Sequence, residues 1–456
     1  IVIIIVIILI TDNNSITSSN NNIATVTPSS CTLSTIANTC NLTITGQESG
    51  YTILLATPSG SSANQYFMQI AAIDVITELQ SEPPIESQPS QPPVESGSIV
   101  ESSVSVLTIA VSQGTTRGVC AYPYDNAPCV SVTICEPGNS SNCSTIDNVL
   151  IDSGSYGLRV FRSVLSNSVV NSLPYMTYNG SQVGECVGYG GGQSNWGVVQ
   201  YADVKLGEPA ATATNIPIQI INSNYANSSN RCYNNVVSSP DEFGMNGVIG
   251  VGPALDDGNW GHYYDCGDGD HCSGLAIDPP AYVVNPITKL GSGKNNGITM
   301  VLPPISDLGA TGVSGYAVFG VATNSNNTPS QDAHLLKISN TYAGRFNMHT
   351  QYEGRTMDSF FDSGSNFLYF PSYTLPTCVS GFYCPDGNNL QHAVLDDGNG
   401  HVHSVDFNIG NIYTLFYTHN TAFYNLGAYY NDMFDWGLPF FFGKTMYLVF
   451  PGESTT

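Results

Sequence analysis

The sequence predicts an all-β protein, and three observations indicate this. Only 10% of the residues are charged and Ser, Thr, Asn and Gly dominate, whereas long helices favour Ala, Leu, Glu, Lys and Arg. Apolar and polar residues alternate over short stretches with turn signals between them, as in strands. No long amphipathic helical pattern is evident. At 456 residues the chain is long enough for a large core and several domains.

The first stretch, IVIIIVIILI at Ile1–Ile10, predicts a hydrophobic β-strand, because nine of its ten residues are Ile or Val. It is too short to span a bilayer, which takes about 20 residues. Three outcomes stay open for this strand. It is buried in its own fold, or it is the remnant of a trimmed segment, or it is donated to a neighbouring copy and builds a homo-polymer.

The next segments are distinguished by composition. Residues 1–22 combine the hydrophobic strand with a polar linker, and residues 23–78 alternate in the manner of a small β-sandwich domain. Residues 79–101 are rich in Pro, Ser and Glu, which predicts an extended linker. From residue 102 onward the chain is continuously strand-like.

The charge balance excludes some functions. The chain has 11 Lys and Arg against 35 Asp and Glu, for a formal net charge of −24. Phosphate binding requires clustered basic residues, so neither nucleic acid nor an anionic membrane surface is expected as a partner. The balance suits an exported, acid-tolerant protein at the cell surface or outside the cell.

The twelve cysteines fall into pairs, most of them at hairpin spacing. This pattern predicts six disulfide bonds and an oxidising compartment. A zinc site would need Cys-x-x-Cys pairs, and none is present, so no metal is expected. The expected bonds are Cys31–Cys40, Cys120–Cys129, Cys135–Cys143, Cys186–Cys232, Cys266–Cys272 and Cys378–Cys384.

One short sequence motif occurs twice. VLIDSGSYGLRVF contains Asp152, and SFFDSGSNFLYFP contains Asp362. In each, an acid follows apolar strand residues on a tight turn, and two such turns can bring two carboxyls together. Like charges that close share one proton, so one carboxylate can act as general base on water while the other, protonated, polarises a carbonyl.

The neighbours of the two acids supply the hydroxyls and backbone N–H groups that such a dyad needs. Ser and Gly beside each acid also leave room for the second carboxyl. These supporting residues are Ser153, Gly154 and Ser155 in the first turn and Ser363, Gly364 and Ser365 in the second.

With these motifs the sequence resembles the pepsin-type bilobal aspartic peptidases over residues 104–456. The resemblance implies lobes at 102–305 and 306–456, with Asp152 and Asp362 as the catalytic pair. It implies an apolar-Gly pair behind each motif, which NGVIGVGP supplies at Ile249-Gly250 and FFFGKTMYLVF at Phe442-Gly443. A flap hairpin is implied by VGYGGGQSNWGVVQ, with Tyr189 as the flap tyrosine.

A second resemblance is closer. VSVTICEPGNSSNCSTIDNVLIDSGSYGLRVF, SGFYCP and FDWGLPFFFG look like a bacterial exported family of unknown function. This resemblance supports the fold and export, and it implies nothing about the substrate.

A calcium site in the acidic loop at residues 256–272 stays open, through Asp265, Asp268 and Asp270. No cofactor is expected. The sequence thus predicts an exported aspartic endopeptidase that hydrolyses peptide or protein substrates at acid pH. The alternative is a non-catalytic pepsin-like subunit of an extracellular filament, joined through the donated strand at Ile1–Ile10.

Overall fold

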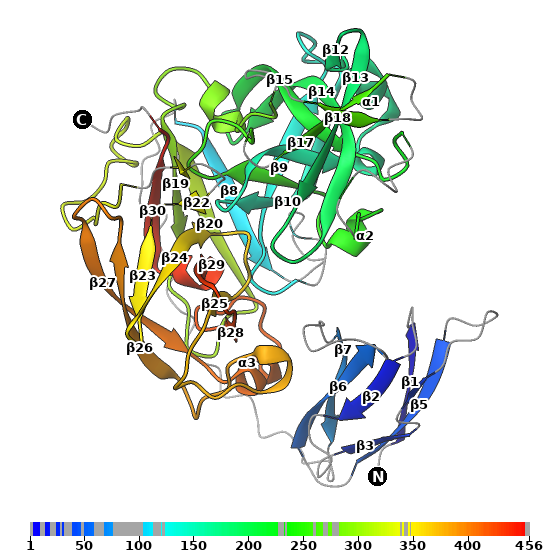
Figure 1. Ribbon diagram of the computed structural model, residues 1–456, viewed down its shortest axis with the longest axis vertical. Helices are drawn as coiled ribbons and strands as arrows, with labels where there is room; N and C mark the ends of the chain where they lie inside the picture. The colour runs from blue at the N-terminus through cyan, green and yellow to red at the C-terminus, as the bar shows by residue number, and fades with distance from the viewer. Residues whose placement is uncertain are drawn as a thin grey trace, which may run out of the picture. The chain divides into compact units, whose positions relative to one another are not determined.

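The computed structural model describes residues 104–451 except 113–119, 121–123, 227–231, 233–234, 259–260, 268–271, 276–281, 338–339, 342–344 and 347. Of residues 1–103 it describes only the backbones of seven strands. The chain divides into two compact units (Figure 1), one with the strands of residues 1–98 and the other with nearly all of residues 99–456.

The first unit contains two small sheets with strand orders β1-β5-β3 and β4-β2-β6-β7. The strands are β1 Ile3–Leu9, β2 Asn14–Ser18, β3 Ala24–Thr27, β4 Ser30–Cys31, β5 Thr39–Gly46, β6 Gly50–Pro58 and β7 Met68–Val75.

The hydrophobic strand predicted at the amino terminus is confirmed as a strand. It pairs antiparallel with β5 of its own chain, from Ile3 opposite Thr45 to Leu9 opposite Thr39. This pairing corresponds to the alternative in which the strand stays within its own fold. A homo-polymer through this strand concerns other copies and stays a prediction. The side chains of Cys31 and Cys40 lie outside the described part, so their bond also stays a prediction.

The second unit is built on a 14-stranded sheet, whose path runs β18-β17-β13-β14-β15-β11-β16-β10-β9-β8-β20-β19-β30 with β12 paired to β13. The strands are β8 Val106–Ser112, β9 Pro128–Cys135, β10 Cys143–Asp152, β11 Tyr156–Phe161, β12 Thr177–Tyr178, β13 Ser181–Gly188, β14 Ser194–Leu206, β15 Ala211–Ile221, β16 Gly247–Val251, β17 His262–Cys266, β18 Ser273–Leu275, β19 Gly297–Leu302, β20 Gly312–Phe319 and β30 Lys444–Val449.

A seven-stranded sheet, yellow to red in Figure 1, completes this unit in the order β27-β26-β23-β24-β29-β25-β28. Its strands are β23 His349–Tyr352, β24 Arg355–Asp362, β25 Leu368–Phe370, β26 Asn389–Asp396, β27 Val402–Ile409, β28 Gly427–Tyr429 and β29 Met433–Gly437, and β21 Asn340–Thr341 pairs separately with β22 Arg345–Phe346. We call residues 128–275 the amino-terminal lobe and residues 349–437 the carboxy-terminal lobe.

Helices are short: the longest in the described part of the chain has six residues. Side chains of Ser166, Ser239 and Asn411 cap the three α-helices at their amino ends. The helices are α1 Asn167–Ser172, α2 Pro240–Phe243 and α3 Ile412–Tyr417, with 3₁₀ turns η1 Arg162–Val164, η3 Pro286–Lys289, η4 Val379–Gly381 and η5 Leu438–Phe441. The all-β class predicted from the sequence is confirmed. None of these described helices is both long and apolar enough to cross a membrane.

The two lobes contribute different kinds of side chain to one continuous hydrophobic cluster. Strands of the amino-terminal lobe bury aliphatic side chains, such as Val132, Ile134 and Ile151. The carboxy-terminal lobe packs aromatic rings, and the ring centroid of Phe434 lies 4.2 Å from that of Trp436 and 4.6 Å from that of Phe370. Because each set of side chains fills the space behind a strand that ends in an Asp-Ser-Gly-Ser turn, each fixes one acid.

Four of the predicted disulfide bonds are confirmed: Cys120–Cys129, Cys135–Cys143, Cys186–Cys232 and Cys266–Cys272. These bonds fit an oxidising compartment.

The prediction of a bond between Cys378 and Cys384 is wrong for this structure, in which no disulfide joins these two described residues. The hairpin register explains why. Thr377 lies opposite Tyr383, and the N–H of Cys384 donates to Pro376. Cys378 is therefore diagonal to Cys384, and diagonal neighbours lie roughly 7–8 Å apart, too far for the bond.

Candidate active site

In the amino-terminal lobe Asp152 is the last residue of β10. Strand β16 pairs with β10 and passes behind the Asp-Ser-Gly-Ser turn. Strand β16 runs parallel to β10, with Asp152 opposite Gly250, and antiparallel to β11. A Cβ on Gly250 would lie 2.3 Å from the backbone nitrogen of Tyr156. Only glycine fits there, which explains the apolar-Gly pair predicted at Ile249-Gly250.

The carboxy-terminal lobe repeats this arrangement with Asp362 at the end of β24. Strand β29 runs parallel to β24, with Asp362 opposite Gly437, and antiparallel to β25. A Cβ on Gly437 would lie 2.1 Å from the carbonyl oxygen of Phe367.

The glycine behind the second motif is therefore Gly437, and the prediction of Phe442-Gly443 is wrong. Gly443 lies beyond η5, outside β29, and a Cβ there would meet nothing closer than 3.4 Å. Trp436-Gly437 is the pair in register with Asp362, because β29 is the strand that pairs with β24.

The two turns brace each other through their first serines. Ser153 Oγ donates to the carbonyl of Phe361 (3.0 Å) and accepts from the N–H of Ser363 (2.9 Å). Reciprocally, Ser363 Oγ donates to the carbonyl of Ile151 (2.7 Å) and accepts from the N–H of Ser153 (3.0 Å). Four hydrogen bonds thus fix one turn against the other.

The glycines of the turns make room for the carboxyls. A Cβ on Gly154 would lie 2.5 Å from Cγ of Asp362, and one on Gly364 would lie 2.7 Å from Cγ of Asp152. The two carboxyls are close enough to share a hydrogen bond. The structure thus brings Asp152 and Asp362 together, as the sequence predicts.

Each carboxyl is held by its own turn. The N–H groups of Gly154 and Gly364 donate to Asp152 Oδ1 (2.7 Å) and Asp362 Oδ1 (2.8 Å). Ser155 Oγ donates to Asp152, and Ser365 Oγ donates to Asp362 Oδ2 (2.8 Å).

The electrostatics favour a shared proton. Burial raises the pKa of Asp152 well above its ordinary value, and the charge of Asp362 and the hydrogen bond to it raise this pKa further. The bonds from Ser155 and Gly154 oppose the rise. The pair therefore holds a proton at acid pH, and that proton belongs to the pair rather than to one residue.

Tyr189 lies in the hairpin that joins β13 to β14. Its N–H donates to the carbonyl of Gln193 (2.9 Å), which makes a tight turn, and its hydroxyl accepts from Asn195 Nδ2 (2.9 Å). Its ring centroid lies 5.7 Å from that of Phe243. Burial raises the pKa of Tyr189, the charge of Arg159 opposes this, and the charge of Asp152 adds to the rise.

Sequence reasoning missed Asn126, which ties the segment just before β9 to the carboxy-terminal lobe beside the dyad. Its Nδ2 donates to the carbonyls of Asn366 (2.9 Å) and Phe423 (2.8 Å), and its Oδ1 accepts from the N–H of Phe423 (2.7 Å). Burial raises the pKa of the adjacent Asp125 to about 6. A single polar residue in a turn-like stretch gives no sequence signal for such a role.

Sequence reasoning also missed Asp435, a buried acid in β29 that acts on the dyad electrostatically. An acid between Phe434 and Trp436 has the alternation of a strand with one solvated face. Asp435 instead lies on the same sheet face as Asp362, and it is buried there.

A buried ion cluster lies behind the flap strand β13. Arg159 Nη2 donates to Glu185 Oε1 (2.8 Å) and to Asp257, and the Tyr263 hydroxyl donates to Asp257 Oδ1 (2.6 Å). Burial, followed by the charge of Glu185, raises the pKa of Asp257 well above its ordinary value. One arginine faces two carboxyls, so the cluster is neutral when it holds one proton.

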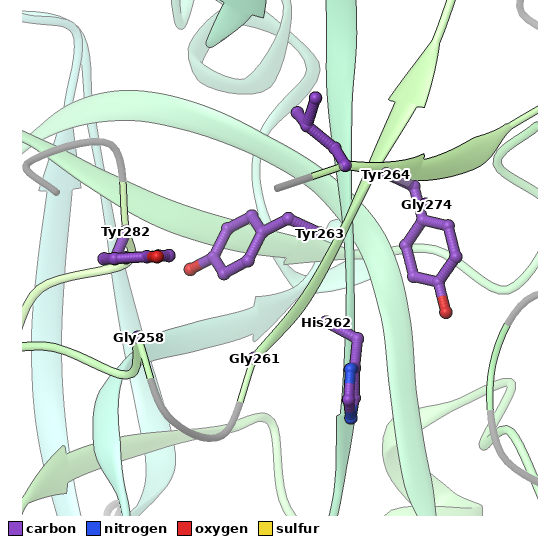
Figure 2. Close-up of a pocket in the computed structure, with 8 residues that line it drawn as sticks. Gly258, Gly261, His262, Tyr263, Tyr264, Gly274 and Tyr282 are labelled. Atoms are coloured by element: carbon purple, nitrogen blue, oxygen red, sulfur yellow. The ribbon is translucent and has the colours of Figure 1, made fainter. Parts of the chain in front are cut away.

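A cavity of about 290 Å³ adjoins this cluster (Figure 2). Tyr263 and Tyr282 lie side by side in its wall, with ring centroids 5.5 Å apart, and His262 and Tyr264 come from the same strand, β17. Residues 259–260 and 276–281, next to it in sequence, lie outside the described part. We therefore assign the cavity no ligand.

The structure does not test the calcium site predicted in the acidic loop. Asp265 lies in β17, and Asp268 and Asp270 lie outside the described residues. Among the residues that the structure does describe, no group of three or more His, Cys, Asp or Glu side chains is placed to hold a metal ion.

Two lobes, each with an Asp-Ser-Gly-Ser turn facing the other, define a bilobal pepsin-like fold. The chain belongs to the family described as a protein of unknown function, DUF3443, whose model matches residues 101–456. Among solved structures it is similar to the aspartic proteinase from Irpex lacteus, with 13% identity and a TM-score of 0.39 over 74% of this chain and 92% of that one. No curated protein matches it by sequence.

Proposed function

We propose that this protein is an aspartic endopeptidase that hydrolyses peptide bonds at acid pH through Asp152 and Asp362. The observation that supports this most is the carboxyl pair itself. The carboxyl of each acid packs against the glycine of the opposite turn, where a side chain would have no room. A core that needed only a stable turn has no reason to place two acids in contact, because the charges repel.

The chemistry follows from the shared proton. One carboxylate takes a proton from a water molecule, which attacks the peptide carbonyl, while the protonated carboxyl donates to the carbonyl oxygen. The tetrahedral intermediate then breaks, and the nitrogen that leaves takes a proton from the dyad. The serine and glycine donors around each acid keep both carboxyls oriented throughout.

The substrate would be an extended peptide or protein segment lying over the dyad. Tyr189 and Phe243, whose rings pack against each other, would contact it from the amino-terminal lobe. We propose that the protein acts outside the cytoplasm, where its four disulfide bonds persist.

Cleavage of a denatured protein substrate between about pH 2 and pH 6 tests the proposal. We expect Asp152→Asn and Asp362→Asn each to reduce the rate at least about a thousandfold, because each removes the general base or the acid. Asp358→Asn is the matched control: it lies on the same strand as Asp362 with a half-exposed side chain and should keep full activity. A wild-type protein that cleaves nothing over this range, or cleavage that survives both dyad substitutions, would refute the proposed function.

A further inference from the structure

Asp435 is a third acid on the dyad's side of the carboxy-terminal lobe. The parallel register pairs Asp362 with Gly437 and Phe360 with Asp435, so Asp362 and Asp435 point to the same face of the sheet. Asp435 is buried, and its Oδ1 has no hydrogen-bond partner among the described residues. Since an unpaired buried acid is costly, its presence beside a carboxyl pair requires an explanation.

The amino-terminal lobe has no such acid. Gly250 corresponds to Gly437, because each lies opposite the acid of its lobe. The residue two positions earlier is Val248 in one lobe and Asp435 in the other. The third acid is therefore an addition to one lobe and not a requirement of the shared scaffold.

Ser365 connects the third acid to the dyad. Its hydroxyl donates to Asp362 Oδ2 (2.8 Å), and the same serine lies close enough to Asp435 to lower the pKa of that acid. A hydroxyl has one hydrogen to donate. When Asp435 is protonated it can donate to Ser365 Oγ, and the serine hydrogen stays on Asp362. When Asp435 is ionised it can only accept, and it competes with Asp362 for that hydrogen.

The surroundings favour the protonated form at acid pH. The titratable groups that face Asp435 are Asp362 from β24, Tyr369 from β25, which lies opposite it in the sheet, and Asp152 from the other lobe. Burial raises the pKa of Asp435 well above its ordinary value, and the charge of Asp362 adds to this, while the bond with Ser365 opposes it. No cation acts on it from the described residues.

We propose that Asp435 is a positioning residue for the dyad, and that the active site works with three carboxyls and two protons. One proton is shared by Asp152 and Asp362, and the other stays on Asp435 and keeps Ser365 donating to Asp362. Loss of the second proton to solvent adds a like charge and withdraws that hydrogen bond. Both changes disturb the hydrogen bonding and the charge balance that hold the carboxyl pair in its working geometry, so activity falls. This inference rests on the proposed function.

The first test is the pH profile of kcat/KM for peptide cleavage. Wild type should lose activity at high pH with a slope steeper than one log unit per pH unit, because two protons are lost. Asp435→Asn keeps a donor to Ser365 but has no proton to lose. It should keep its activity at low pH within about twofold and fall with a slope of one. Asp435→Val removes the donor and should lower kcat about tenfold with little change in KM.

The matched control is Val248→Ala at the equivalent position of the other lobe, which should leave the pH profile unchanged. If the profile of Asp435→Asn superimposes on that of wild type, the inference is wrong. It is equally wrong if Asp435→Val is as active as wild type at every pH.

The second test does not need activity. The free energy of unfolding should fall as pH rises from about 4 to 7, and it should fall less in Asp435→Asn, because the native state holds a proton there that the unfolded chain releases. That difference should shrink in an Asp362→Asn background, which removes the like charge. Equal slopes in wild type and Asp435→Asn overturn the inference.

The two tests also separate the inference from the proposed function. A protein without peptidase activity but with the Asp435 slope, coupled to Asp362, refutes the function and keeps the protonation of Asp435. A protein that has peptidase activity but lacks the Asp435 slope keeps the proposed function and refutes the protonation of Asp435.

Discussion

The two lobes present the same turn on differently built scaffolds. All four disulfide bonds of the described residues lie between residues 120 and 272, on the amino-terminal side. The carboxy-terminal lobe relies on stacked rings, with Phe434 between Phe370 and Trp436. The comparison shows that the site constrains a short set of positions and leaves the surrounding core free to vary.

The shared positions are those in contact with the dyad. Gly250 and Gly437 occupy equivalent places behind the acids, and Ser153 and Ser363 exchange equivalent hydrogen bonds. Two residues further along the same strands, the lobes diverge. Arg159 and Val248 lie side by side in one lobe, and Tyr369 and Asp435 lie side by side in the other.

This divergence has an electrical consequence. In the amino-terminal lobe the buried charge is compensated, because Arg159 contacts Glu185 and Asp257. In the carboxy-terminal lobe Asp435 has no such cation among the groups that act on it. The pseudo-symmetric pair therefore lies in an asymmetric field, which distinguishes one carboxyl from the other.

The largest expected effect comes from filling the space behind either acid. Gly250→Ala and Gly437→Ala should each destabilise the fold by more than about 4 kcal/mol, because the new methyl would overlap backbone atoms at 2.3 and 2.1 Å. Thermal unfolding measures this.

Gly443→Ala is the control, and its cost should be only about 1 kcal/mol, from its φ of +73°. If Gly443→Ala is as damaging as Gly437→Ala, the equivalence of Gly250 and Gly437 is lost.

The glycine shows where sequence reasoning succeeds and where it stops. The acids and their serines are predictable because each turn is a short, contiguous sequence motif. The choice between Trp436-Gly437 and Phe442-Gly443 is not local, since it depends on which stretch pairs with β24. Both stretches are apolar and end in glycine, so the sequence alone does not separate them.

Similar limits apply to the cysteines and the buried charges. Pairs at short separation were predictable as hairpin bonds, but Cys378 and Cys384 fail because the register of their hairpin makes them diagonal. Arg159 and Asp435 both stand in apolar strands, where a charged residue normally marks a solvated face. Both are nevertheless buried, because other parts of the fold cover the sheet face on which they lie, and that is tertiary information.

The second effect tests the disulfides of the amino-terminal lobe. Replacing Cys186 and Cys232 together by Ala should reduce stability by about 4 kcal/mol, because their bond closes a loop of 46 residues. Cys384→Ala, in contrast, should cost less than about 1 kcal/mol, since no disulfide joins Cys384 to Cys378. Denaturant unfolding under non-reducing conditions measures both. Equal losses would show that the lobes do not differ in this respect.

The third effect tests the bracing between lobes. Ser153→Ala and Ser363→Ala should each cost about 2 kcal/mol, because each leaves a buried N–H and a buried carbonyl without a partner. The costs should be similar in the two lobes, and the double substitution should cost less than their sum, since the bonds are coupled. Ser→Thr at either position keeps the hydroxyl and serves as control. Additive or very unequal costs would indicate that the turns are fixed independently.

The smallest effect concerns pH and the charge cluster of the amino-terminal lobe. Burial and Glu185 raise the pKa of Asp257, so the native state binds this proton more tightly than the unfolded chain. The stability from it is fully present below about pH 4 and is lost as pH rises through the folded pKa, by at most about 1.4 kcal/mol per pH unit. Asp257→Asn should flatten this part of the stability curve and leave the slope due to Asp435 unchanged, because the two acids belong to different lobes. Unfolding measured from about pH 4 to pH 7 checks this. If Asp257→Asn also removes the pH dependence of unfolding that is due to Asp435, the two acids are electrostatically coupled and the lobes do not titrate separately.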